Sequence, residues 1–123
     1  MRELAIGTKR FTIIVAVDDP SHGHACHEYI IERVDANKDD DKRFCIINFQ
    51  KGPIKEHGVN GIHNEDLLCI VIDRLQGFQS GPFKCKENAM ALTKIEEALM
   101  WLNKRTKKRQ EQNVEGTSEI HKS

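Results

Sequence analysis

The chain has 123 residues, of which 38% are hydrophobic, a size that fits one small domain with a modest core. Nineteen basic residues balance nineteen acidic ones, so no overall field favours nucleic acid or a membrane surface. No segment approaches the roughly 20 apolar residues of a membrane helix, and MRELAIGTKR lacks the apolar core of a secretory signal. We therefore expect a cytosolic protein that gains buried surface by oligomerisation.

The four cysteines are widely spaced and include no CxxC pair, so we expect free, mostly buried thiols and no zinc ribbon. One cluster, His22, His24, Cys26 and His27, contains good zinc ligands. Ligands this close along an extended segment converge only in a sharp loop, and Cys26 with His27 fits instead the start of a strand. We predict no metal site.

Three early runs are alternating or rich in β-branched and aromatic residues: FTIIVAVDD, HEYIIERVDA and KRFCIINFQKG. They predict three antiparallel strands in a small sheet region over residues 1–52. The separating segments DDPSHGHA and ANKDDDK are rich in turn-forming and charged residues and predict surface loops.

Residues 53–63 form a glycine-rich loop in which Asn60-Gly61 is the firmest turn. A first helix is predicted to begin near Asn64, a good N-cap, and to end at Gly77. Its buried face is expected to comprise Leu68, Val71, Leu75 and Phe78.

A longer helix is predicted from Lys86 to about Gln112, so residues 64–112 form a hairpin and residues 113–123 a flexible tail. Asn88 and Thr106 lie at opposite ends of its core stripe. The stripe itself is expected to comprise Ala91, Leu92, Ile95, Ala98, Leu99 and Leu102. The predicted fold class is α+β: a small N-terminal antiparallel sheet followed by a C-terminal helical hairpin, in one domain over residues 1–123.

Met90 and Trp101 lie away from that stripe. Packing against the sheet and a subunit interface both explain them, and in either case we expect Trp101 to be buried.

The second helix ends in the basic run KRTKKRQ. Cations suit a helix C-terminus, so a solvated stabilising end is one interpretation. Helical geometry favours another, because Arg109 returns to the core side and Arg105 to its border. Two guanidiniums inclined towards one groove suit phosphate.

Phe78 and Asn88 each have two interpretations. Phe78 fits a hydrophobic cap on the helix end or a ring that stacks on a base. Asn88 fits a local backbone partner or an amide that reads a base or ribose edge. The chain contains no GxSxG, GxxxxGK[ST], HExxH or GxGxxG motif, so we predict no catalytic residue, no enzymatic activity and no cofactor.

Over most of its length the chain resembles the Thoeris anti-defence family, viral sponges that sequester cyclic ADP-ribose isomers. The resemblance is carried by DDPSHGHACHEYII, FQKGPIKEHGVNG, NEDLLCIVIDRLQGFQSGPFKCKENAMALTKIEEALMWLNKRT and VEGTS. It implies a phage protein in the cytoplasm of the infected bacterium that forms homodimers, with hexamers of associated dimers as the alternative assembly. The implied ligand is glycocyclic ADP-ribose, held without cleavage.

Position by position, the resemblance implies that Phe78 stacks on the base, Asn88 reads the polar edge, and Arg105 with Arg109 anchors the pyrophosphate. It also suggests a second site at Lys86 and Thr93 for cyclic dinucleotides or trinucleotides. Many relatives carry Arg where this chain has Lys86, so a bidentate phosphate donor is missing there. A nucleic-acid- or protein-binding adaptor that uses the basic helix end remains the alternative function.

Overall fold

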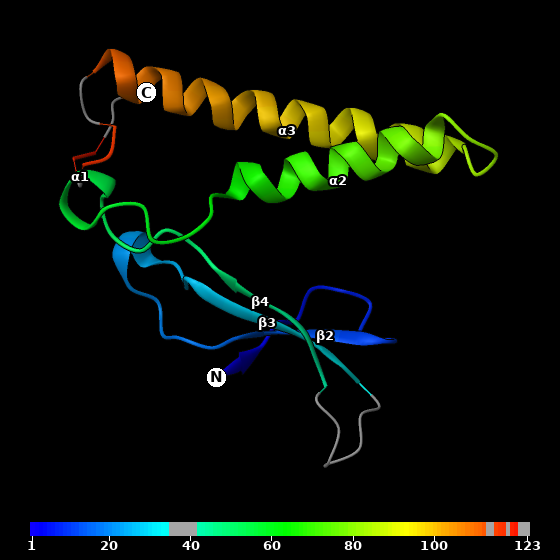
Figure 1. The fold of residues 1–123 in the computed structure, drawn as a ribbon, viewed down its shortest axis with the longest axis horizontal. Helices are drawn as coiled ribbons and strands as arrows, with labels where there is room; N and C mark the ends of the chain where they lie inside the picture. The colour runs from blue at the N-terminus through cyan, green and yellow to red at the C-terminus, as the bar shows by residue number, and fades with distance from the viewer. Residues whose placement is uncertain (35–41, 113–114, 118, 121–123) are drawn as a thin grey trace. The chain divides into compact units, whose positions relative to one another are not determined.

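The computed structural model describes residues 1–34, 42–112, 115–117 and 119–120. The chain contains two compact units, Met1–Ile62 and His63–Ser123. The first holds an antiparallel sheet and the second a helical hairpin (Figure 1). The predicted α+β fold class is confirmed, while the single domain and the flexible tail stay predictions. Residues 113–114, 118 and 121–123 of that tail lie outside the described residues.

The three predicted strands form the body of the sheet. They are β2 (Thr12–Ala16), β3 (Glu28–Arg33) and β4 (Arg43–Asn48), with antiparallel neighbours throughout. Pairs of β-branched residues face one another across the strands, such as Ile14 with Ile31, which suits a pleated surface. Most of the predicted ANKDDDK loop, residues 36–41, lies outside the described residues.

Three short elements were not predicted. β1 (Arg2–Glu3) extends the sheet beside β2, η1 (His22–His24) is a single turn, and α1 (Ile54–His57) interrupts the glycine-rich loop. Elements of two to four residues carry no hydrophobic period, so they depend on hydrogen bonds to neighbouring segments. The Leu4 N–H, for example, donates to the Ile14 carbonyl at 2.8 Å.

The buried apolar core of the described residues is small and consists of Ala16 and Cys26. The described cysteines are free, as predicted, but only Cys26 is buried, whereas Cys45, Cys69 and Cys85 are exposed. The expectation of mostly buried thiols is therefore wrong for this chain by itself. Large apolar side chains remain exposed in both units, including Phe44 on β4 and Met100 on the hairpin.

The hairpin consists of α2 (Asn64–Gln79) and α3 (Lys86–Glu111). α2 begins at Asn64, but its N-cap is His63 and not Asn64 as predicted. The Asp66 carboxylate accepts a hydrogen bond from the His63 backbone N–H at 2.9 Å. The helix ends two residues later than predicted, because Gly77 stays helical and the Ser80 N–H closes the last turn. None of the helices in the described part of the chain is long and apolar enough to span a membrane.

Candidate ligand-binding site

A heptad-like seam joins the two helices of the hairpin. Half-buried residues recur at alternating spacings of three and four along both helices, as in antiparallel coiled coils. The residues with this spacing are Glu65, Leu68, Ile72, Leu75 and Gln79 on α2, and Asn88, Leu92, Ile95, Leu99, Leu102, Thr106 and the more deeply buried Arg109 on α3. Leu67 and Lys108 are half-buried as well but fall outside the spacing. The centre of the seam is apolar, and its ends are polar.

This seam corrects the predicted core faces. Val71 and Phe78 are 39% and 40% exposed, and Ile72, which the prediction omitted, lies in the seam instead. Ala91 and Ala98 are exposed as well. The predicted buried faces were too broad or displaced by one residue. Adjacent apolar residues fit the helical period equally well, and packing against the partner helix decides which of them is buried.

Hydrogen bonds within the connection hold together the helix ends that carry Phe78 and Asn88. The Gln79 side chain donates to the Cys85 carbonyl at 3.1 Å and accepts from the Cys85 N–H at 3.0 Å. The Cys85 thiol then accepts from the Asn88 N–H at 3.4 Å, which caps α3. Phe78 and Asn88 therefore share the turn end of the hairpin.

The basic residues occupy the far end. Arg105 is exposed, whereas Arg109 is only 9% exposed and donates from Nη2 to the Thr117 carbonyl at 3.2 Å. At about 1.5 Å of rise per residue, Asn88 and Arg105 are about 25 Å apart along α3. The structure therefore does not bring the four predicted residues together within one hairpin.

Helical register nevertheless places Phe78 and Arg105 on one side of the hairpin. Each immediately precedes a seam residue, Gln79 or Thr106. In a pair of antiparallel helices, the residues directly before the seam residues point to the same side of the pair on both helices. The second helix runs in the opposite direction, so its residues turn about its axis in the opposite sense when viewed from one end. It also faces the opposite way across the seam, and the two reversals cancel. We call this side the aromatic flank. It carries Asn64, Leu67, Val71, Arg74 and Phe78 on α2, and Glu87, Ala91, Lys94, Ala98, Trp101, Arg105 and Lys108 on α3.

Trp101 lies on the aromatic flank and is 60% exposed, with the Lys104 ammonium 4.9 Å from its ring centroid. The expectation that Trp101 is buried is therefore wrong for this chain alone. The flank combines apolar side chains such as Val71 and Ala98 with the cations Arg74, Lys94 and Arg105.

Lys86 and Thr93 fall on the opposite side, which we call the second flank. Both are exposed, and the Thr93 hydroxyl donates to the Ala89 carbonyl one turn earlier at 3.1 Å. The two predicted sites thus occupy different sides of one hairpin.

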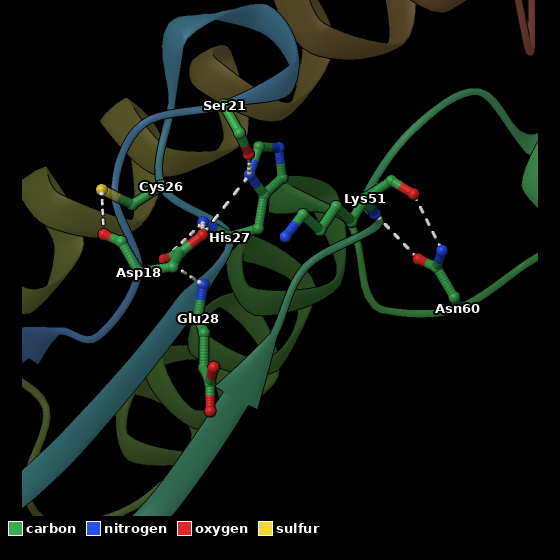
Figure 2. A network of polar contacts seen from close by, with 7 residues as sticks. All are labelled: Asp18, Ser21, Cys26, His27, Glu28, Lys51 and Asn60. Atoms are coloured by element: carbon green, nitrogen blue, oxygen red, sulfur yellow. Dashed lines mark hydrogen bonds and ion pairs between the residues drawn. The ribbon is translucent and has the colours of Figure 1, made fainter.

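In the sheet unit, Asp18 organises the loop before β3 (Figure 2). Its carboxylate accepts from the His27 N–H at 2.9 Å and from the Glu28 N–H at 3.0 Å. These backbone donors, chiefly that of Glu28, hold the pKa of Asp18 below its usual value. Sequence reasoning missed this role, although an aspartate just beyond the end of a strand, as Asp18 is two residues after β2, is a signal for such a turn.

The histidines of this unit cluster without forming a ligand set. The His22 ring lies 6.2 Å from the His27 ring and 6.0 Å from the His57 ring, centroid to centroid. The Ser21 hydroxyl and His27 Nδ1 are 3.2 Å apart. No group of three potential ligands in the part of the chain described here is arranged to hold a metal ion.

Asn60 closes the glycine-rich loop, as its turn signal suggested. Its amide accepts from the Lys51 N–H and donates to the Lys51 carbonyl, both at 2.8 Å (Figure 2). Gly61 then approaches the backbone beside β4, where a Cβ would lie 2.6 Å from the Asn48 carbonyl oxygen. Only glycine fits that approach.

These features define a class of protein: a small α+β chain whose antiparallel helical hairpin presents exposed aromatic and basic side chains. Residues 41–107 match the family described as Acb2/Tad1, hairpin domain, and the chain belongs to that family. Over 82 residues it is 60% identical to Thoeris anti-defense 1 of Bacillus phage SBSphiJ7. The match covers 67% of this chain and 58% of that protein. The relationship expected from the sequence is confirmed.

Proposed function

We propose that this chain is a phage anti-defence sponge that captures glycocyclic ADP-ribose in the cytoplasm of an infected bacterium and inhibits Thoeris immunity. The principal support is the aromatic flank, where an exposed ring and an exposed guanidinium stand on one side of the hairpin. A cyclic ADP-ribose presents a base, polar sugar edges and a pyrophosphate. Stacking, amide hydrogen bonds and guanidinium forks match these three features.

The ligand is held between two copies of the chain. Phe78 and Asn88 lie too far from Arg105 and Arg109 for one hairpin to place all four on a small ring, as the rise of α3 requires. Two hairpins packed flank against flank in opposite directions place the aromatic end of one beside the cationic end of the other. The apolar side chains of the flank, among them the exposed Val71, supply surface for this homodimer.

Capture proceeds without cleavage. A phenyl ring, an amide and guanidiniums provide neither a nucleophile nor a general base at neutral pH. Enclosure between two copies removes the pyrophosphate from water, which is favourable only when both charges are fully paired. Inhibition then depends on stoichiometric removal of the messenger.

The second flank is proposed to bind cyclic dinucleotides or trinucleotides at a further interface, in hexamers built from dimers. Lys86 supplies a point charge there and Thr93 a hydroxyl. Because the flanks are opposite, both ligand classes should bind at once. Competition between them in calorimetry would contradict separate sites.

Mass spectrometry of released molecules tests the main proposal. Purified protein is incubated with cyclic ADP-ribose isomers and cyclic oligonucleotides, desalted and heated. We expect intact glycocyclic ADP-ribose in the supernatant; a hydrolysed product or no retained molecule would overturn the proposal. An adaptor that used the KRTKKRQ run would instead bind long nucleic acid with steep salt dependence spread over several cations.

A further inference from the structure

Arg74 contacts the ring of Phe78. It lies one turn earlier on α2, and its guanidinium carbon is 5.6 Å from the ring centroid, within cation–π range. Arg74 is exposed. Among the residues that the structure describes, the Arg74 side chain makes no hydrogen bond or ion pair. Its recorded electrostatic interaction is the cation–π contact with the Phe78 ring.

The arrangement affects how Phe78 can receive a base. An exposed aromatic side chain loses rotamer freedom when it stacks, and that entropy opposes binding. A guanidinium over one face of the ring limits the rotamers of Phe78 before the ligand binds. The opposite face of the ring stays accessible to a nucleobase. The cation lies on the side of the hairpin that carries Phe78, since both belong to the aromatic flank.

We propose that Arg74 is a positioning residue for nucleobase stacking: it holds the Phe78 ring from one face so that the base occupies the other. This inference rests on the proposed capture of glycocyclic ADP-ribose. It adds a cation to the aromatic end of the site, and this cation acts on the ligand through the Phe78 ring.

A double-mutant cycle with glycocyclic ADP-ribose as the probe tests this role. Calorimetry compares wild type, Arg74→Ala, Phe78→Leu and the double variant. We expect Arg74→Ala to weaken binding roughly tenfold when Phe78 is present, and less than about twofold when Phe78 is Leu, because the arginine acts through the ring. Arg74→Lys should recover only part of the loss, since an ammonium lacks the planar stacking surface.

An unchanged dissociation constant in Arg74→Ala, or an equal loss in both backgrounds, would overturn the inference. Absence of binding by wild type would instead remove the proposed function itself. Arg10→Ala is the matched control, because Arg10 lies 5.0 Å from the Phe11 ring in the sheet unit. It should leave the affinity unchanged. Thermal midpoints of all variants verify that each remains folded.

Discussion

The Arg109 guanidinium at the end of α3 donates to the carbonyl oxygen of Thr117, 3.2 Å away, beyond the helix. This contact holds a largely buried cation at the polar end of the hairpin seam. A guanidinium that is already oriented loses less freedom when it binds a phosphate. Arg109 is therefore better prepared for an anchoring role than an exposed lysine of the same run.

Arg109→Ala is expected to weaken glycocyclic ADP-ribose binding by about 1.5–3 kcal/mol, the usual contribution of a hydrogen bond to a charged group. The fold should persist, as measured by far-UV circular dichroism, while calorimetry records the affinity. Lys107→Ala removes an exposed neighbouring charge and should change little. Unchanged ligand retention by Arg109→Ala would reject the anchor.

Mixing two defective variants should restore binding if the site is shared. Phe78→Ala and Arg105→Ala each damage both sites of a homodimer. After unfolding and refolding together, a mixed dimer contains one site with an intact Phe78 from one copy and an intact Arg105 from the other. Native mass spectrometry should detect one ligand on the mixed dimer.

The double variant Phe78→Ala/Arg105→Ala refolded with wild type is the matched control. In that mixed dimer each of the two shared sites carries one defect, so native mass spectrometry should find the ligand on wild-type homodimers and none on the mixed dimer. One ligand on this mixed dimer, and none on the mixed dimer of Phe78→Ala with Arg105→Ala, would show that each chain builds its own site.

Gly61→Ala should destabilise the sheet unit, because its Cβ would meet the backbone of Asn48 and Phe49. Overpacking of this kind costs about 1–3 kcal/mol, which urea denaturation can measure. Gly77→Ala provides the contrast, since no atom lies within 4 Å of its Cβ position and it is helical. It should stabilise α2 by roughly 0.5–1 kcal/mol.

Acid should weaken the loop that Asp18 organises. Its folded-state pKa is lowered, so its contribution to stability is complete above the unfolded pKa of about 3.9 and disappears as the pH falls through the folded value. Asp18→Asn should therefore be less stable than wild type near neutral pH. The difference in urea midpoint should shrink in strong acid; a difference independent of pH would contradict this role.

Much of the fold could be predicted because its longer elements carry their own periodic signal. The runs that became β2, β3 and β4 alternate or are β-branched, and α3 ends within one residue of its predicted limit. β1 and α1 were missed because two to four residues contain no period. On α2 the adjacent residues Val71 and Ile72 are both apolar, so the sequence pattern could not show which of the two enters the seam.

By itself the sequence determined the fold class, the hairpin and the residue types suited to a nucleotide, since these depend on local periodicity and side-chain chemistry. The tertiary structure decided which helical positions enter the seam, because only a packed neighbour distinguishes adjacent apolar residues. It also decided the partners of Asp18, Arg74 and Arg109. Those contacts depend on the positions of atoms in the folded chain, which the periodicity of the sequence does not specify.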